Sequence, residues 1–435
     1  MNVKYLILIL LTFFCGTGLF AQDDLQQKNE GENLTIKIAV AGAGNELYFW
    51  WGHIALVVED SDTGRNRFYD YGLFSFESEN FYTNFIMGLM LYSCGASSAE
   101  ANIANFKKRN RSVVYYTLDF PPETRIKIKN FLEENIIPQN RDYRYHLFRD
   151  NCSTRIRDVI DYAVDGQFKE QYGNIKGRFT LRDHVRRHTY FSPFTNWFLS
   201  FLMGQVIDTP ITVWDDMFVP AEVGKLIQEF SYNDANGVRR NLISSPESIE
   251  VIFESAGRPE VLDTPRLQSP QEFAFSLVLC SIFGFFFYLY YKNKRIGRTL
   301  AGISMSLCGF VFGLSGLLLY FLAIFTNHDY TYQNANMIFS SPILLAAIPI
   351  GIGYAVTKSS QKLITYDLLS RILWLFTAAA ILVSMLLKIL PEFYQKNLPD
   401  QLLMLPISLL FAFQPAGLRT TIDKYFKKKN QKAES

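Results

Sequence analysis

The chain has 435 residues, of which 49% are hydrophobic and 19% are charged, and its formal net charge at pH 7 is +2. This length allows two domains. So small a net charge, without a basic stripe interleaved with aromatic residues, argues against a nucleic-acid partner. The hydrophobic residues are distributed unevenly, because a first part of mixed composition is followed by a series of long apolar runs. This division predicts a soluble domain followed by a membrane domain.

The first 21 residues have the pattern of a secretory signal peptide. Lys4 precedes an apolar run from Tyr5 to Phe14, and Ala21 provides a small residue for cleavage. The run is too short for a comfortable membrane span. Cys15 raises the alternative of a lipoprotein signal, but the residues before it lack the small side chain that such a site favours. We therefore expect an exported mature chain that begins after Ala21.

Residues 22–245 are expected to form an exported α+β domain. Segments rich in β-branched and aromatic residues predict strands, and other segments have helical patterns. Turn residues between Asp60 and Gly64 predict that the second and third strands form an antiparallel hairpin. The expected strands are residues 35–41, 53–59, 67–71 and 112–118, and the expected helices are residues 99–108, 122–135 and 153–164.

The segment from His146 to Asp158, HLFRDNCSTRIRD, carries the strongest functional signal in the chain. Asp150 and Asn151 are good helix caps, and apolar residues at helical spacing follow them. Cys152 is therefore expected in the first helical turn, where exposed backbone N–H groups and the helix dipole favour a thiolate. We predict that Cys152 is a nucleophile.

A nucleophilic thiol needs a base, and His53 on the expected strand 53–59 is the candidate. Taken alone, a histidine on a strand is more often a structural residue. Asp70, on the neighbouring expected strand, is the first choice for the group that orients the imidazole. Tyr69 is the second choice for this role.

Three further groups near Cys152 are candidates for oxyanion stabilisation or for orientation. Asn151 and the backbone amide of Cys152 could stabilise an oxyanion. Arg155 is the third candidate. Its structural alternative is an ion pair with Asp158, three residues along the same helix.

Two other interpretations of these residues remain open. Cys94 and Cys152 are the two cysteines of the exported part, so they could form a disulfide in an oxidising compartment. His184 and His188 have the spacing of a metal-binding pair, but no third ligand is apparent, and their charged surroundings indicate a solvated helix face. We expect neither a metal nor another cofactor.

Residues 190–230 are unusually aromatic. Packing against the α+β core is the preferred explanation, and contact with a membrane interface is the alternative. The residues concerned are Tyr190, Phe191, Phe194, Trp197, Phe198, Phe201, Trp214 and Phe218.

A polar linker is expected at residues 246–271, and an all-α membrane domain of five spans at residues 272–418. Each apolar run is near the ~20 residues needed to cross a bilayer. If the first domain is exported, the basic residues fall in loops on the cytoplasmic side and in the tail at residues 419–435. This topology predicts an inner-membrane protein with a periplasmic N-terminal domain and a cytoplasmic tail. The runs are residues 273–291, 300–325, 337–356, 369–390 and 402–418.

Four motifs resemble those of the Lnb family: WGH at 51–53, YDYGLF at 69–74, FRDNCSTRIRD at 148–158 and MFVP at 217–220. The third of them is the most specific. The order of His before Cys is also similar to that of circularly permuted papain-like (NlpC/P60-like) thiol enzymes. The resemblance covers most of the mature chain, and it implies a periplasmic papain-like catalytic domain followed by a multi-span membrane domain.

The resemblance implies lipoprotein N-acylation. In this reaction Cys152, assisted by His53, would take an acyl chain from a membrane phospholipid as a thioester. The α-amino group of the diacylglyceryl-cysteine of a lipoprotein would then accept the chain. The expected partners are therefore diacylated lipoproteins, phospholipid and the lipid bilayer. His328, Asn334 and Asn336 resemble the polar loop of the family's membrane part, which implies contact with substrate.

Two alternative functions fit parts of the same sequence. A periplasmic, membrane-anchored cysteine peptidase or amidase acting on peptidoglycan peptides would share the Cys/His pair. One span would suffice to anchor such an enzyme, so five expected spans favour the acyltransferase. A non-enzymatic envelope protein with a Cys94–Cys152 disulfide is the third hypothesis.

Overall fold

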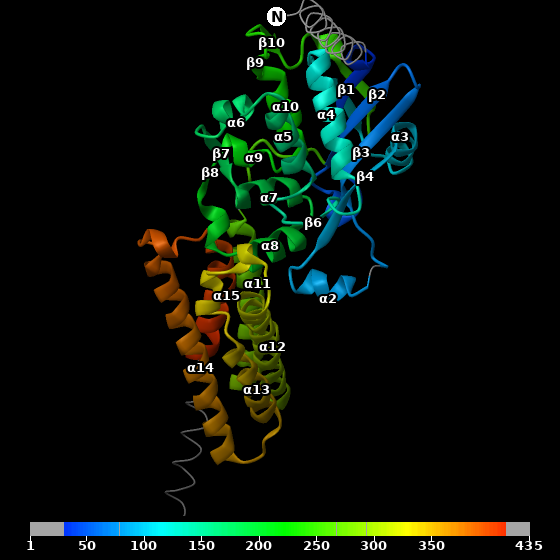
Figure 1. The fold of residues 1–435 in the computed structure, drawn as a ribbon. Helices are drawn as coiled ribbons and strands as arrows, with labels where there is room; N and C mark the ends of the chain where they lie inside the picture. The colour runs from blue at the N-terminus through cyan, green and yellow to red at the C-terminus, as the bar shows by residue number, and fades with distance from the viewer. Residues whose placement is uncertain (1–29, 78, 267, 293, 415–435) are drawn as a thin grey trace, which may run out of the picture. The chain divides into compact units, whose positions relative to one another are not determined.

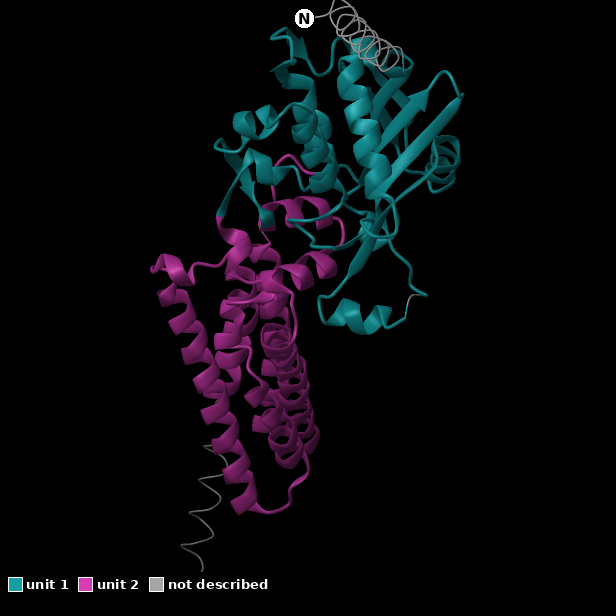
Figure 2. Ribbon diagram, in the orientation of Figure 1, with its two compact units in different colours: residues 1–181, 210–261 teal, residues 182–209, 262–435 magenta. Residues whose placement is uncertain are grey.

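The computed structural model describes residues 30–77, 79–266, 268–292 and 294–414. They form two compact units (Figures 1 and 2). Unit 1 contains the residues up to Leu181 together with Pro210–Val261, and unit 2 contains Arg182–Thr209 and the residues from Leu262 onward. The expected signal peptide at residues 1–21 and the expected basic tail at residues 419–435 lie outside the described residues.

Unit 1 is built on a seven-stranded antiparallel sheet with the strand order β11-β5-β1-β2-β3-β4-β6. All four strands expected from the sequence are present, and β2 and β3 pair as the expected antiparallel hairpin. The strands are β1 (Leu34–Ala41), β2 (His53–Asp60), β3 (Arg65–Leu73), β4 (Leu91–Ser98), β5 (Val113–Thr117), β6 (Asp142–Arg144) and β11 (Ile249–Phe253).

Helices cover both faces of this sheet. α4 and α10 pack on β1 and α5 packs on β2, whereas α3 packs on β3 and β4 (Figure 1). α5 buries Ile156, Val159 and Ile160 in the larger hydrophobic core, and complete burial of such side chains stabilises a fold by ~1.5–3 kcal/mol each. These helices are α3 (Ala99–Lys108), α4 (Pro122–Asn135), α5 (Cys152–Ala163) and α10 (Pro220–Glu229).

The remaining elements of unit 1 are short. β7 pairs with β8 and β9 pairs with β10, each as a separate two-stranded sheet. The elements are α2 (Phe81–Ile86), α6 (Gln167–Tyr172), β7 (Lys176–Thr180), β8 (Pro210–Thr212), α9 (Val213–Asp216), β9 (Ser231–Asn233) and β10 (Arg239–Asn241).

The segment expected to be a polar linker at residues 246–271 is partly structural. β11 lies within it and pairs with β5, and Arg258 donates hydrogen bonds to the backbone carbonyls of Asn110 and Arg109. The linker prediction is therefore wrong for this part. The polar residues around the short run IEVIF concealed a strand whose pairing partner lies far away in the sequence.

Among its described residues, unit 2 contains three helices that are long and apolar enough to cross a membrane: α11 (Ser269–Tyr291), α12 (Arg295–Phe325) and α14 (Ser360–Leu387). Shorter apolar helical segments occupy Pro342–Val356, which ends in α13 (Ala347–Val356), and α15 (Leu398–Phe413). The expected third span, at residues 337–356, is therefore not one continuous α-helix. Ser341-Pro342 interrupts it, because a residue before proline avoids helical geometry.

Residues 182–209 belong to unit 2 and not to the α+β core (Figure 2). They form most of α7 (Leu181–Thr189) and all of α8 (Pro193–Leu202). In α8, Trp197 and Phe201 line a small cavity together with Phe312 of α12 and Met404 of α15. The preferred explanation for the aromatic segment was therefore wrong for α8, but Trp214 and Phe218 are buried in unit 1 as expected.

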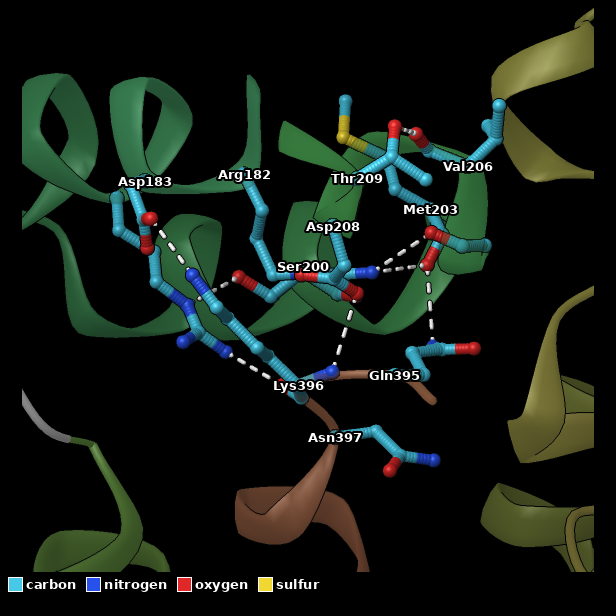
Figure 3. A network of polar contacts seen from close by, with 12 residues as sticks. Arg182, Asp183, Ser200, Met203, Val206, Asp208, Thr209, Gln395, Lys396 and Asn397 are labelled. Carbon is cyan, nitrogen blue, oxygen red and sulfur yellow. Dashed lines mark hydrogen bonds and ion pairs between the residues drawn. The ribbon is translucent and has the colours of Figure 1, made fainter. Parts of the chain in front are cut away.

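A buried polar network fixes these helices within unit 2 (Figure 3). Arg182 pairs with Asp208 at 2.8 Å and also donates to the carbonyls of Ser200, Met203 and Gly204. Lys396 pairs with Asp183 at 2.6 Å (Figure 3). This network satisfies the donors of the buried Arg182 guanidinium, as burial requires.

The histidines of α7 lie inside this unit. His184 and His188 are both buried, so the expected solvated face is wrong. His188 donates a hydrogen bond from Nδ1 to the carbonyl of His184 at 2.8 Å. Among the described residues, no group of three or more His, Cys, Asp and Glu side chains could hold a metal ion.

Candidate active site

Cys152 is the first residue of α5, as the sequence predicts. Asn151 caps the helix, and its Oδ1 accepts hydrogen bonds from the backbone N–H groups of Ser153 at 2.8 Å and Thr154 at 3.0 Å. The Thr154 hydroxyl accepts a hydrogen bond from the Asn151 backbone in return, which completes a capping box. Cys152 therefore lies at the positive end of the helix dipole, where negative charge is stabilised.

The Asn151 side chain has no N–H group left for an oxyanion. Its Nδ2 donates to the carbonyls of Leu147 at 2.9 Å and Phe218 at 3.0 Å. Because an amide has two donor hydrogens, these bonds use its whole donating capacity. The structure thus gives Asn151 a positioning role, and the backbone amide of Cys152 is the remaining candidate for an oxyanion donor.

His53, the first residue of β2, contacts Asp70 of β3. His53 Nε2 lies 2.9 Å from Asp70 Oδ1, and the same oxygen accepts the backbone N–H of Gly72 at 2.6 Å. The Cys152 side chain also acts on the His53 imidazole and raises its pKa. The fold therefore brings together the three residues that the sequence predicts as nucleophile, base and orienting group.

Charge interactions dominate at this cluster. Burial acts to lower the pKa of His53, but the negative charges of Asp70 and Cys152 outweigh it and raise that pKa to about 10. For Asp70, burial acts to raise the pKa of the carboxyl group, yet the charge and hydrogen bond of His53 hold it below the usual value. The arrangement favours an imidazolium beside the Asp70 carboxylate at neutral pH.

Two other predicted groups have different partners. The Tyr69 hydroxyl donates to Glu133 of α4, so Tyr69 does not orient His53. Arg155 binds Asp150 through two hydrogen bonds, of 2.5 and 2.7 Å, and Arg157 pairs with Asp158. The alternative ion pair of Arg155 with Asp158 is therefore not formed, because Arg155 pairs with Asp150 from the turn before the helix.

The polar residues predicted to contact substrate from the membrane domain have partners within unit 2. Asn334 donates to the carbonyls of Phe201 and Leu202, and Asn336 donates to Phe201 and to Asp400. Both side chains are buried. His328 Nδ1 lies 2.8 Å from the Tyr330 hydroxyl. Asn334 and Asn336 hold the loop to α8, and contact of this loop with substrate stays a prediction.

Cys94 and Cys152 are both free thiols, so the disulfide alternative does not match the structure. Cys94 is buried in β4, and burial raises the pKa of its thiol to about 12. A thiol in such surroundings is inert at neutral pH.

Three residues near His53 were not predicted from the sequence: Gly72, Phe106 and Arg111. Gly72 lies against the imidazole, because a Cβ added there would be 2.6 Å from His53 Cε1. Phe106 of α3 has its ring 6.5 Å from the His53 ring and also lies against the guanidinium of Arg111. Gly72 lies within the YDYGLF motif, so the motif could have indicated that Gly72 is near the site. Arg111 stands in the polar run KKRNR, which resembles an ordinary solvated surface.

Replacing Asp70 by asparagine is expected to lower the pKa of His53, because the main charge that raises it is lost while burial remains. The pair stabilises the folded state above the pH at which Asp70 is protonated. That stabilisation is complete below pH 6.5 and is lost as the pH rises through about 10. The difference in Tm between wild type and Asp70→Asn should therefore be largest between pH 4 and pH 6.5 and should shrink towards pH 10.

A matched control is Asp165→Asn, which breaks an exposed pair with Lys127. Exposed ion pairs contribute little to the stability of a folded protein, so the Tm of Asp165→Asn should stay close to that of wild type at all of these pH values. A Tm difference for Asp70→Asn that does not depend on pH would contradict the assigned ionisation of the pair.

Comparison with known families gives two matches. Residues 21–187 match the Lnb N-terminal periplasmic domain, and residues 264–394 match the Lnb transmembrane domain. No curated protein and no solved structure matches the chain. The two matches identify an inner-membrane protein with a periplasmic N-terminal domain.

Proposed function

Because the chain belongs to the Lnb family of lipoprotein-processing membrane proteins, we propose that it is a lipoprotein N-acyltransferase. It would move an acyl chain from a membrane phospholipid to the α-amino group of the diacylglyceryl-cysteine of lipoproteins. The observation that carries the proposal is the cluster of Cys152, His53 and Asp70 in the periplasmic domain of a chain that also has membrane helices.

In the first step the Cys152 thiolate attacks the ester carbonyl carbon of the phospholipid. The new C–S bond forms as the ester C–O bond breaks, and the protonated His53 gives its proton to the departing glyceryl oxygen. The products are an acyl-thioester on Cys152 and a lysophospholipid. A histidine whose pKa is raised to about 10 is protonated at neutral pH, which suits this acid role.

In the second step the α-amino group of the lipoprotein attacks the thioester carbonyl. The C–S bond breaks, the thiolate of Cys152 is restored, and the proton lost by the amine passes to His53. The product is an N-acylated lipoprotein, and the enzyme returns to its starting state. Asp70 keeps the imidazole oriented in both steps.

An exposed aromatic surface on unit 1 favours a lipid substrate over a soluble peptide. We define it by five residues that flank or belong to α2: Phe74, Phe76, Phe81, Tyr82 and Phe85. Phe76 is 50%, Tyr82 69% and Phe85 52% exposed, which is unusual for such large apolar groups. Glu77 and Glu79 lie in the segment between Phe76 and Phe81, but residues 80–99 contain no charged side chain. The part of the surface on α2 therefore suits hydrocarbon better than a charged peptide.

This aromatic surface is continuous with the surroundings of the thiol. The ring of Phe74 lies 4.9 Å from that of Tyr92, and Tyr92 interacts electrostatically with Cys152. An acyl chain lying on the surface would therefore extend towards the proposed nucleophile.

The remaining parts of the proposal concern fold and topology. The order of His53 on a strand before Cys152 at the start of a helix supports a permuted papain-like domain. The two shorter apolar helical segments of unit 2 would complete five membrane crossings together with the three long helices. An odd number of crossings after a periplasmic domain would leave the C-terminal tail in the cytoplasm.

The test is to express the chain in a bacterial strain that lacks its own lipoprotein N-acylation and to analyse lipoprotein N-termini by mass spectrometry. Wild type should add one acyl chain, and Cys152→Ala should add none. Cys280→Ala is the matched control, because Cys280 lies in α11, remote in sequence from the thiol motif, and it should retain activity. Diacylated N-termini in the presence of folded wild-type protein would overturn the proposal, and a change in peptidoglycan fragments would then favour the peptidase alternative.

A further inference from the structure

Arg111 is a buried arginine at the end of the sheet that carries His53. Ala41, the last residue of β1, is paired with His53 of β2 on one side and with Val113 of β5 on the other. Arg111 lies two residues before Val113, and its Nε donates to the carbonyl of Gly42 at 2.9 Å. Only 1% of the Arg111 residue is exposed. Backbone pairing and this hydrogen bond therefore place the guanidinium beside the candidate active site.

Two aromatic rings enclose the guanidinium. Its carbon lies 4.2 Å from the centre of the Phe49 ring and 5.1 Å from the centre of the Phe106 ring. Phe106 in turn contacts His53. The rings replace water around the cation, and a cation–π contact offsets part of the lost hydration.

The charge of Arg111 has no carboxylate partner at ion-pair distance in the described part of the chain, and its Nη2 makes no hydrogen bond. The buried Arg182 shows the ordinary structural alternative, because it pairs with Asp208 and donates to three carbonyls. An arginine placed only for structure would be satisfied in this way. Arg111 instead keeps a buried positive charge that requires an anion nearby.

The groups with the largest charge effects on Arg111 are Cys152, Arg109, Arg258 and Glu46. Burial lowers the pKa of Arg111 to about 10, so it is charged at neutral pH. Arg111 also helps to hold the pKa of Asp70 below its usual value, after the larger effect of His53.

Cys152 interacts electrostatically with His53, Arg111, Tyr92 and Tyr143. Burial raises the pKa of Tyr92 to about 12 and raises that of Tyr143 further, so both stay neutral near pH 7. Of these four groups, His53 and Arg111 are the positively charged ones at neutral pH.

We propose that Arg111 is the buried counter-ion of the Cys152 thiolate, held between Phe49 and Phe106 so that its charge favours the anionic form of the nucleophile. It is a positioning residue, because it acts through Cys152 and Asp70 and does not contact substrate. This inference rests on the proposed role of Cys152 as the nucleophile.

The test measures the rate at which iodoacetamide alkylates Cys152 in the purified full chain over a range of pH, with mass spectrometry of the peptide that contains Cys152. Arg111→Gln should move the rate profile up by about one pH unit and slow alkylation at pH 7 by about tenfold, because an opposite charge nearby is lost. Arg111→Lys, which keeps the charge, should restore most of the rate. Arg109→Gln is the matched control, since Arg109 lies two residues away and is also near Phe49, but it is more exposed and pairs with Glu46.

An unshifted profile for Arg111→Gln, or equal shifts for the Gln and Lys variants, would overturn the inference. If Arg111→Gln does not fold, the wild-type protein can be tested alone by comparing the rates at which two reagents alkylate Cys152. Its Cys152 should then prefer the anionic iodoacetate over iodoacetamide more strongly than the same cysteine in the urea-unfolded chain. An equal or weaker preference would overturn the inference.

These outcomes are separate from those for the proposed function. If wild type adds no acyl chain to lipoproteins but Arg111→Gln shifts the alkylation profile, the acyltransferase proposal fails and the counter-ion stands. If wild type acylates lipoproteins and the profile does not shift, the counter-ion fails alone.

Discussion

Replacing His53 by alanine is expected to lower the rate of lipoprotein N-acylation by about 10²–10⁴-fold, the usual contribution of a positioned general acid or base. Two effects combine. The leaving glyceryl oxygen loses its proton donor, and the Cys152 thiolate loses the imidazolium that accompanies it. Alkylation of Cys152 at pH 7 should also become slower. Both rates can be measured on one preparation, by mass spectrometry of lipoprotein N-termini and of the Cys152 peptide.

The His53→Ala variant also leaves Asp70 as a largely buried, unpaired charge, since the Asp70 side chain is only 15% exposed. This can destabilise the protein by up to about 3 kcal/mol. The double variant His53→Gln with Asp70→Asn removes both charges and keeps two side chains that can hydrogen bond. The Tm of this double variant should be close to that of wild type, but the variant should remain inactive. Acylation at the wild-type rate in either variant would remove His53 from the mechanism.

Gly72→Ala is expected to disturb the same site through space alone. The added Cβ would lie 2.6 Å from His53 Cε1 and 3.1 Å from Asp70 Oδ1, so the imidazole must move. Overpacking of this kind costs about 1–3 kcal/mol. A displacement of about 1 Å at a reacting group can reduce the rate by about 10²-fold. The loss of N-acylation should therefore be much larger than the modest decrease in Tm suggests.

Gly284→Ala provides the control, because a Cβ at Gly284 meets no atom within 4 Å. This variant should keep both its Tm and its activity. Wild-type activity in Gly72→Ala would show that the imidazole has more freedom than the structure indicates. If Gly72→Ala lowers the Tm and its activity recovers at lower temperature, the loss of activity is caused by unfolding and not by displacement of the imidazole.

The core of the candidate site was predictable because its signals are local. A cap residue followed by an apolar helical pattern placed Cys152 at the start of α5. Hairpin residues placed the strands of His53 and Asp70 side by side. Arg111 could not be found in this way, because its burial depends on Phe49 and Phe106, which come from separate parts of the chain. The run KKRNR gives no sign that one of its arginines is buried.

The fold of unit 1 was also predictable where its signals are local. The strands expected from the sequence have strong β-branched patterns, and all of them are present in the structure. β4 contains Ser-Cys-Gly-Ala-Ser-Ser, a weak strand pattern that is stabilised by pairing with β3 and β6. His184 and His188 appeared solvated because their charged neighbours are usually exposed. The partners that permit their burial, such as Lys396 for Asp183, lie about two hundred residues later.

The division of the chain into units has a practical consequence for anyone who wishes to cut it. The polypeptide passes between the units three times, after Leu181, after Thr209 and after Val261. A fragment that ends at residue 245 would lack β11, and it would carry α8 without the helices that line its cavity. A single protease cut after Val261 would leave unit 1 joined to residues 182–209, which pack in unit 2. Fragments for biochemical work should instead retain the whole chain, or replace residues 182–209 with a short bridge.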